Sequence, residues 1–427
     1  KLLSEIAVKD TGLGKVDDKI LKNTRKTIGL LRDLKHVKTN GIIKKDVKKG
    51  LTYIARPVGL VAAMTPATNP IATPLNNIIN ALKCRNSIII SPSPKGARVC
   101  TKIIKLAHKA LRRVGAPTSI VQSISPLSKM SDSLELFSLA DLVIATGAQD
   151  NIKKAIQTGT PTLGVGVGNV PSIIDSSADL KDAANKIKIS KTFDNSTSCS
   201  SENSVIVVGS IYNKFIYYLK KEGGVLLNTP EKKILAKKMW DKNFFLNRDL
   251  IAKHASKITN EIGLDRVKYS NAKFLIVNEK GIGKRYPFSM EKLSPVLTIY
   301  KVKNFNQSVK LAKKILQNQG QGHSCSVHSK NKTNIIRIGK ELPVCRVIVN
   351  QIHSFATGGS FDNGLPFSLS MGCGTWGKNI FDENLNYKHF LNITKIVNKI
   401  KINQPTEHEI FSKYWKKFPK ARLKGDI

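Results

Sequence analysis

Short apolar runs alternate with segments of helical periodicity over much of the first half of the chain. Residues 58–64 (VGLVAAM), 86–91 (NSIIIS) and 141–147 (DLVIATG) are typical of buried strands. Between the last two lies GARVCTKIIKLAHKALRRVGAP, in which apolar residues recur at helical spacing until Gly115 and Pro117 end the helix. Strands that alternate with helices in this way predict a largely parallel sheet with helices on both faces. The predicted fold class is therefore α/β.

The chain divides into three predicted parts, as its 427 residues allow. Residues 1–168 carry the first α/β pattern. Residues 169–375 carry a second one, with strands at SVIVV, KFLIVN, VLTIYKV and RVIVN. Residues 376–427 form a C-terminal segment in which NYKHFLNITKIVNKI has the pattern of a helix. Lys1 opens within a helical pattern, KLLSEIAVKD, so we expect the natural N-terminus to lie further upstream.

The formal net charge of +40 admits nucleic acid, an anionic membrane surface or anionic ligands as partners. The lysines are spread along the whole chain instead of forming one arm or stripe. We therefore interpret the charge mainly as compositional drift, with a benefit in attracting anionic substrates. A basic nucleic-acid-binding protein without enzymatic activity is a distant alternative, because aromatic residues make up only 6% and are not interleaved with a basic patch.

The six cysteines include no C-x-x-C pair. This pattern argues against a zinc ribbon and a disulfide framework, and favours a reducing cytoplasm. His323, Cys325 and His328 lie close together in GHSCSVHS, but their spacing matches no common metal site, so we expect no metal. No apolar run approaches the length needed to cross a bilayer, and we expect no membrane partner.

Three motifs each have a structural and a functional interpretation. TLGVGVGNVP is a weak dinucleotide fingerprint, because Pro171 stands where a phosphate-binding helix would begin; a glycine-rich strand close to a ligand is the better interpretation. Asn69, in MTPATNP, is either an ordinary turn asparagine or an amide donor for developing negative charge. Cys199 lies among hydroxyl residues in KTFDNSTSCSSENS, and is either structural or a nucleophile.

Together, the order and spacing of these motifs match one family. The chain resembles the CoA-acylating branch of the aldehyde dehydrogenase superfamily in blocks along essentially its whole length, among them DTGLGKVDDKILKN, ARPVGLVAAMTPATNP, ATGAQDNIKKA, GVGVGNVPSIID, SKTFDNSTSCSSEN, MEKLSPVLTIY and GQGHSCSVHS. The resemblance implies the aldehyde dehydrogenase fold: a parallel-sheet dinucleotide-binding domain (1–168), an α/β catalytic domain (169–375) and oligomerisation segments. These segments would be a hairpin at about 41–55 and part of 376–427, giving a homodimer or homotetramer.

The resemblance also implies the chemistry of the site. Cys199 matches the family nucleophile, which would form a thiohemiacetal and then a thioester, while the Asn69 amide and the backbone N–H of Cys199 would hold the oxyanion. Hydrolytic relatives carry a water-activating glutamate at a position that the alignment assigns to Gly164, so we expect acyl transfer to CoA. His323 matches a histidine of the acylating branch that assists the thiol step, with a structural role as the alternative. Cys373 is expected to be structural.

In this superfamily the dinucleotide lies across the parallel sheet without the usual glycine fingerprint. Glu291, in MEKLSP, matches the glutamate that bonds the nicotinamide ribose. The other expected cofactor-binding residues follow strands or lie in the glycine-rich segment: Ser91, Pro92, Lys95, Thr146, Gly147 and Gly166. SPSPKGAR has no acidic residue for a ribose 2′-hydroxyl, while Lys95 and Arg98 could neutralise a 2′-phosphate, which favours NADP over NAD.

The hydroxyl residues around Cys199 favour an anionic aldehyde. Acetaldehyde-type relatives carry apolar residues before the cysteine, whereas this chain has hydroxyl residues on both sides of it: Ser196, Thr197, Ser198, Ser200 and Ser201. The loop NQIHSFATGGSFDNG should face them and contributes His353; its other polar residues are Gln351, Ser354 and Thr357. Such a pocket would leave donors unpaired around a methyl group, and suits a sulfonate or carboxylate. STSCSSEN also resembles family members that convert sulfoacetaldehyde, CoA and NADP to sulfoacetyl-CoA and NADPH. Acetaldehyde and succinate semialdehyde are the alternatives.

Overall fold

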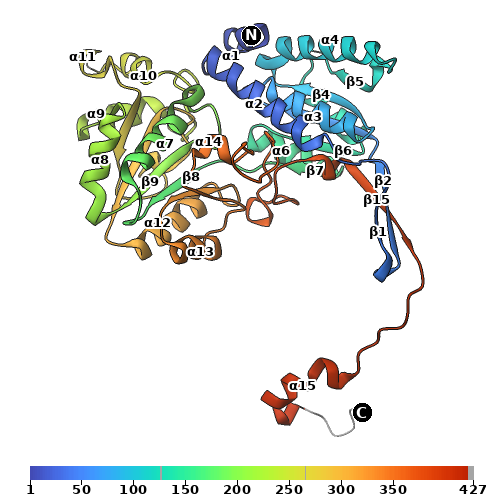
Figure 1. Ribbon diagram of the computed structural model, residues 1–427. Coiled ribbons are helices and arrows are strands. Elements are labelled where there is room, and N and C mark those ends of the chain that lie inside the picture. Colours follow the sequence, from blue (N-terminus) through green and yellow to red (C-terminus); the bar gives the residue numbers. More distant parts are fainter. Residues whose placement is uncertain (126, 265, 422–427) are drawn as a thin grey trace. The chain divides into compact units, whose positions relative to one another are not determined.

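The computed structural model describes residues 1–125, 127–264 and 266–421, which form two compact units (Figure 1). The first unit comprises Lys1–Val37 and Pro57–Leu391, and the second comprises Lys38–Arg56 and Asn392–Ile427. The end of the predicted C-terminal segment, 422–427, lies outside the described residues. The first unit contains two parallel sheets, and the candidate site described below lies entirely within it.

The first sheet has five parallel strands in the order β5-β4-β3-β6-β7. The strands span Val121–Ser123 (β5), Ser87–Pro92 (β4), Leu60–Thr65 (β3), Leu142–Ala145 (β6) and Thr162–Gly164 (β7). The helices of this region span Leu2–Thr11 (α1), Val16–Leu34 (α2), Ala72–Lys83 (α3), Ala97–Arg113 (α4), Met130–Leu139 (α5) and Gln149–Ile156 (α6).

Side-chain alternation along β3 accounts for the two layers of helices on this sheet. Val61 and Ala63 pack with side chains of α1, α3 and α4, whereas Ala62 and Met64 pack with those of α5 and α6. Successive side chains of a strand point to opposite faces, so a strand that is apolar throughout requires cover on both. Helix α2 packs against α1 and α3.

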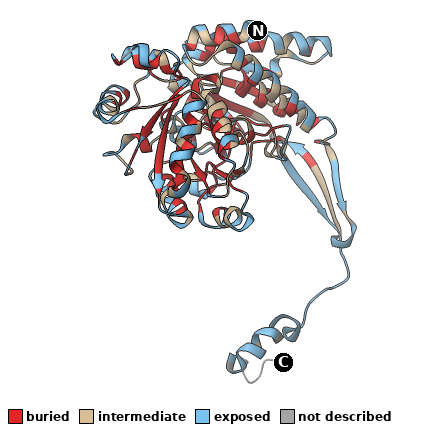
Figure 2. Ribbon diagram, turned by 60° about the vertical axis from the view of Figure 1, so that its left-hand side comes forward, coloured by how far each residue is buried: buried red, intermediate tan, exposed pale blue. Residues whose placement is uncertain are grey.

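The second sheet has seven parallel strands in the order β10-β11-β12-β9-β8-β13-β14. They span Gly224–Leu226 (β10), Phe274–Asn278 (β11), Val296–Val302 (β12), Glu202–Val208 (β9), Val170–Ile174 (β8), Cys325–His328 (β13) and Val347–Val349 (β14). The helices span Leu180–Thr192 (α7), Tyr212–Lys221 (α8), Thr229–Met239 (α9), Ala255–Glu261 (α10), Arg266–Tyr269 (α11), Phe305–Asn318 (α12), Lys332–Glu341 (α13) and His353–Ala356 (α14). Figure 2 shows the strands of the two parallel sheets, which both belong to the first unit, as largely buried.

The predicted α/β class and the strand–helix alternation are confirmed. The glycine-rich segment differs from its prediction as one strand: β7 ends at Gly164, residues 165–169 form a loop, and β8 begins at Val170 in the other sheet. Pro171 lies inside β8, where the register with β9 shifts. A proline, which lacks an N–H, is tolerated inside a sheet at such an irregularity.

The second unit contains a hairpin of Gly41–Asp46 (β1) and Leu51–Pro57 (β2), joined by a short 3-10 turn, as predicted for residues 41–55. Leu391–Val397 (β15) adds a third strand beside β2, and the helix Glu407–Lys417 (α15) follows. The predicted helix in NYKHFLNITKIVNKI is wrong. Ile393, Thr394, Ile396 and Val397 are β-branched residues, which favour extended backbone once a neighbouring strand supplies hydrogen bonds.

Among the described helices, none is long and apolar enough to cross a membrane.

Gly29 fixes how closely α2 approaches the segment that carries Phe367, since a Cβ at this position would lie 2.3 Å from the Phe367 ring. We predict that Gly29→Ala lowers the free energy of unfolding, because overpacking costs about 1–3 kcal/mol and exceeds the ~1 kcal/mol gained in helix propensity. Urea denaturation measures the change. Gly339→Ala, at an exposed α13 position with nothing within 4 Å, is the matched control and should be neutral or stabilising. A stabilised Gly29→Ala would contradict the close approach of α2 to Phe367.

Candidate active site

Cys199 lies in a tight loop between the 3-10 turn Phe193–Ser196 and β9. Asp194, Asn195 and Ser196 have φ values of 50°, 50° and 59°, in the left-handed region that residues other than glycine rarely adopt. The Ser196 hydroxyl donates to the Lys191 carbonyl, and the Thr197 hydroxyl donates to the Asp194 carbonyl. Part of the hydroxyl cluster therefore holds a strained turn that aims the thiol, which is typical of functional sites.

The buried carboxylate of Asp194 joins this loop to α2. Its oxygens accept hydrogen bonds from the Lys15 backbone N–H (2.9 Å), Lys19 Nζ (3.0 Å) and Lys22 Nζ (2.6 Å). Burial alone would raise the pKa of Asp194, but the charges of Lys22 and Lys19 outweigh it and hold the pKa below its ordinary value. The carboxylate is therefore ionised at neutral pH.

The thiol of Cys199 is half-buried, and its Sγ lies 3.3 Å from Nε2 of His323. Burial, reinforced by Glu291 and Cys373, raises the pKa of Cys199 to about 12. Burial, together with the charge of Arg346, holds the pKa of His323 well below its ordinary value. The site at neutral pH thus pairs a protonated thiol with a neutral imidazole that can accept a proton.

Two neighbours hold the His323 ring and backbone. Nδ1 of the ring lies 2.7 Å from the Ser324 hydroxyl. The guanidinium of Arg346 donates to the His323 carbonyl (3.1 Å), the Gly372 carbonyl and Oδ1 of Asn384 (3.1 Å). The imidazole is therefore oriented before any ligand arrives.

A cavity of about 670 Å³ opens at the carboxyl ends of β3, β4 and β6. The sequence-predicted residues Asn69, Ser91, Pro92, Thr146, Gly147, Gly166, Thr197, Cys199, Glu291 and His323 all line it. In the described part of the chain, Oδ1 of Asn69 has no hydrogen-bond partner, and no acceptor is found for the backbone N–H of Cys199. The backbone N–H of Cys199 is therefore available to an oxyanion at the thiol, whereas for Asn69 the donor would be Nδ2 of the same carboxamide, since Oδ1 is an acceptor.

Two residues that the sequence assigns to a 2′-phosphate lie elsewhere. Lys95 is exposed and does not line the cavity, and the guanidinium of Arg98 pairs with Asp10 at 2.8 Å. The cations that do line the cavity are Lys129 and Arg248. Both were missed, because Lys129 precedes a helix in SPLSKMSDS and Arg248 lies in an irregular segment without a motif.

Gly164, which the sequence alignment assigns to the position of the water-activating glutamate in hydrolytic relatives, is not the residue that faces the cavity. A Cβ at Gly164 would lie 2.8 Å from Ile152, so a side chain at Gly164 would meet α6. The next residue, Val165, lines the cavity instead, and it too lacks a carboxylate. Glu291 is the one carboxyl side chain among the described residues of the cavity lining. Burial raises its pKa to about 8 against the opposing charges of Lys191 and Lys292, so it is mostly protonated at neutral pH.

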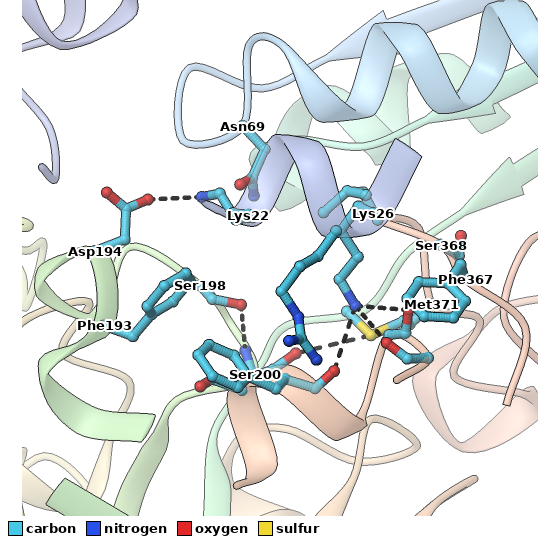
Figure 3. A pocket seen from close by; sticks show the side chains of 16 residues that line it. Lys22, Lys26, Asn69, Phe193, Asp194, Ser198, Ser200, Phe367, Ser368 and Met371 are labelled. Carbon is cyan, nitrogen blue, oxygen red and sulfur yellow. Dashed lines mark hydrogen bonds and ion pairs between the residues drawn. The ribbon is translucent and has the colours of Figure 1, made fainter. Parts of the chain in front are cut away.

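A second, smaller pocket of about 40 Å³ adjoins the cavity through Asn69, Leu369 and Met371, which line both. Ser198 and Ser200, on either side of Cys199, lie on one side of it, and Lys22 and Lys26 of α2 lie on the other (Figure 3). Arg25 of α2 also lines it. The spacing of these cations, i, i+3 and i+4, places them on one helical face, a signal that does not stand out among 70 lysines and arginines.

His353 differs from its prediction as a substrate-facing residue. It is fully buried, its Nδ1 lies 2.6 Å from the Ser200 carbonyl, and it lines neither of the two cavities. Of the polar residues predicted in the same loop, only Ser354 lines the small pocket. Gln351 accepts a hydrogen bond from Asn363, and the Thr357 hydroxyl donates to the His353 carbonyl.

Comparison with known proteins decides the family. A family model described as "Aldehyde dehydrogenase family" matches residues 7–226. The chain is 52% identical over 414 residues to a Cupriavidus necator protein named sulfoacetaldehyde dehydrogenase (acylating), covering 97% of this chain and 84% of that protein. The chain belongs to the aldehyde dehydrogenase family.

Two further relatives show how the family resemblance extends. A Clostridium kluyveri protein named succinate-semialdehyde dehydrogenase (acetylating) is 36% identical, over 93% of this chain and 86% of its own length. The crystal structure of an acetylating aldehyde dehydrogenase from Geobacillus thermoglucosidasius has a TM-score of 0.90 at 36% identity, covering 94% of this chain and 88% of that chain. The expected aldehyde dehydrogenase fold is confirmed.

In this aldehyde dehydrogenase, the Asp194 ion pairs hold α2 against the nucleophile loop. We predict that Asp194→Asn lowers the free energy of unfolding by about 3–5 kcal/mol, because removing one partner leaves buried charge uncompensated. The stabilisation needs the ionised carboxylate, so in the unsubstituted protein it is present above the ordinary aspartate pKa and is lost as pH falls through the lowered folded-state pKa.

Urea denaturation at pH 7 compares Asp194→Asn with Asp150→Asn, which removes an exposed partner of Lys153. The control should be unchanged, since exposed pairs contribute little. Equal stability of the two variants would contradict a structural role for the Asp194 pairs.

Proposed function

We propose that this aldehyde dehydrogenase catalyses the CoA-acylating oxidation of sulfoacetaldehyde, in which sulfoacetaldehyde, CoA and NADP give sulfoacetyl-CoA and NADPH. The observation that carries the proposal is the position of the Cys199 thiol. It lies beside a neutral histidine, at a cavity without an ionised carboxylate and next to a small pocket lined by cations. The name of the 52%-identical relative supports the same reaction.

In the first half-reaction, His323 takes the proton of the Cys199 thiol, and the thiolate attacks the aldehyde carbon to give a thiohemiacetal. The Asn69 carboxamide and the backbone N–H of Cys199 stabilise the developing oxyanion. Losing one such donor typically costs about 10²–10³ in rate. A nicotinamide dinucleotide held in the larger cavity, beside Glu291 and Gly166, would supply the hydride acceptor. Cys199 then holds the acyl group as a thioester.

In the second half-reaction, His323, which has released its first proton to solvent, takes the proton of the CoA thiol, and the CoA thiolate attacks the thioester. The bond to Cys199 then breaks, and His323 returns the proton to the leaving Cys199 thiolate. Water is a poor competitor for the same base, because it is far less acidic than a thiol, and the carboxyl group of Glu291, which is mostly protonated near pH 7, offers no second base. Val165 supplies no carboxylate at the cavity wall. Transfer to a thiol, which is more acidic than water, is therefore the favoured outcome.

The cavity lining also supports the cofactor assignment. The residues at the ends of β4 and β6, with Gly166 and Glu291, would hold the dinucleotide across the sheet, and the buried Oε1 of Glu291 has no partner among the described residues. Lys129 and Arg248 are the charged residues at this cavity besides the neutralised Glu291. Two cations and no ionised acid favour NADP over NAD, because NADP carries one more phosphate.

Succinate semialdehyde is the second candidate substrate, because one relative is named for it. The small pocket, of about 40 Å³ and lined by Ser198, Ser200 and Arg25, favours the compact sulfonate head group over the longer succinate chain.

The first experiment mixes the protein with NADP, CoA and sulfoacetaldehyde and follows the absorbance of reduced cofactor. We expect CoA-dependent reduction with a higher kcat/KM than for acetaldehyde or succinate semialdehyde, and no turnover by Cys199→Ala. Cys100→Ala, which removes a buried thiol of α4 outside the lining of both cavities, is the matched control and should retain activity. Turnover without CoA would overturn acyl transfer to CoA, and equal use of acetaldehyde would overturn the substrate.

The role of His323 predicts a pH dependence. The imidazole is a base only above its own pKa, which lies well below the ordinary value of 6.5, so kcat/KM should stay constant around pH 6.5 and fall only at clearly lower pH. His323→Gln should lower kcat/KM by about 10²–10⁴ and remove this acid limb. His108→Gln, on α4, is the control. An unchanged acid limb in His323→Gln would exclude His323 as the base.

A further inference from the structure

Three basic residues of α2, Lys22, Arg25 and Lys26, line the small pocket beside the nucleophile loop. Burial, with the charges of Arg25 and Lys22, lowers the pKa of Lys26 to about 7. Against them stands one acidic residue of the same lining, Asp194. The pocket thus has an excess of positive charge next to Ser198 and Ser200. The three side chains differ in whether other groups of the protein already accept their hydrogen bonds.

The two lysines are engaged by the protein itself. Lys22 Nζ pairs with Asp194 at 2.6 Å. Lys26 Nζ donates to the carbonyls of Gly358 and Gly359 at 2.8 Å and of Phe355 at 3.3 Å (Figure 3 shows its bonds). Three acceptors use all three donors of an ammonium group, so Lys26 supports the chain after α14.

Arg25 is the cation without such a partner. Its guanidinium carbon lies 5.7 Å from the centroid of the Phe355 ring and 5.3 Å from that of Phe361. No carboxylate pairs with it among the described residues, and it is half-buried. Stacking on two rings holds the planar group in place while leaving its N–H donors unused.

Ser354 supplies a second unused donor at the same pocket. Its hydroxyl oxygen is buried and has no hydrogen-bond partner among the described residues. An oriented guanidinium and an unpartnered hydroxyl at a small pocket of about 40 Å³ match a compact group with several acceptor oxygens.

We propose that Arg25 binds the anionic head group of the substrate, with Ser354 as a second donor, and so selects sulfonate-bearing aldehydes over neutral ones. This assignment rests on the proposed function, since it places the aldehyde carbon at Cys199. It makes α2, a helix far from Cys199 in the sequence, part of the substrate site. The guanidinium fork matches two sulfonate oxygens, which an ammonium group cannot do.

The test compares Arg25→Gln with Arg32→Gln. Arg32 lies on the same helix, and its guanidinium carbon is also 5.3 Å from the Phe361 ring centroid, but it pairs with Asp33 at 2.9 Å and does not line the small pocket. For Arg25→Gln we expect a loss of about 10- to 100-fold in kcat/KM for sulfoacetaldehyde, mainly through KM, and a much smaller loss for acetaldehyde. Arg32→Gln should leave both substrates unchanged.

A second readout separates this inference from the proposed function. Ethanesulfonate, an unreactive probe, should inhibit acetaldehyde oxidation by the unsubstituted enzyme competitively, and by Arg25→Gln at least 10-fold more weakly. If sulfoacetaldehyde is a poor substrate but this inhibition depends on Arg25, the proposed substrate fails and the sulfonate subsite stands. If sulfoacetaldehyde is preferred and Arg25→Gln keeps that preference, the subsite fails and the proposed function stands.

Three further variants separate the guanidinium of Arg25 from its neighbours. Arg25→Lys keeps the charge but loses the planar guanidinium, so it should give a KM for sulfoacetaldehyde between those of the unsubstituted enzyme and Arg25→Gln. The same variant replaces Arg25→Gln as the test if Arg25→Gln does not fold. Ser354→Ala should raise the same KM to a smaller extent. If Lys26→Met, instead of the Arg25 variants, abolishes inhibition by ethanesulfonate, the assignment to Arg25 is overturned.

Discussion

The buried carboxylate of Asp194 is the interaction on which the rest of the site depends. It belongs to the strained turn before Cys199, and it binds two lysines and a backbone N–H at the start of α2. A charge buried this deeply is tolerated only when it is paired and hydrogen-bonded. The same contacts therefore keep the turn in its left-handed conformation and bring the next turn of α2, with Arg25, to the small pocket.

The hydroxyl residues around the thiol divide between two tasks. The hydroxyls of Ser196 and Thr197 donate hydrogen bonds to backbone carbonyls at the turn, and the Ser201 hydroxyl lies within hydrogen-bonding distance of the Ser196 hydroxyl. Only Ser198 and Ser200 of the cluster line the small pocket. Some of the hydroxyls that favour a polar substrate in the sequence therefore have a structural task instead. The basic residues of α2 provide stronger support for an anionic substrate than these hydroxyls do.

Local patterns explain how much of the fold the sequence could predict. Long β-branched runs such as those of β9 and β12 identify buried strands without knowledge of their partners, whereas short strands such as β10 and β13 become strands only through pairing within the sheet. The nucleophile and the glycine-rich loop were predictable because each has a local motif. Arg25 and Lys129 were not, because the contacts that distinguish them from other cations join residues distant in sequence.

An anionic substrate creates an electrostatic difficulty that the architecture addresses. A sulfonate held roughly 6 Å from a thiolate would repel it by about 3 kcal/mol at an effective dielectric constant of 20. In the resting site the thiol is protonated, the imidazole is neutral and Glu291 is mostly protonated, so these three groups do not repel the entering substrate. Proton transfer to His323 then creates the thiolate beside an imidazolium, and the basic residues of α2 in the adjoining small pocket offset the charge of the sulfonate. Neutral groups at the thiol and positive groups on α2 therefore both reduce the electrostatic repulsion that an anionic substrate meets.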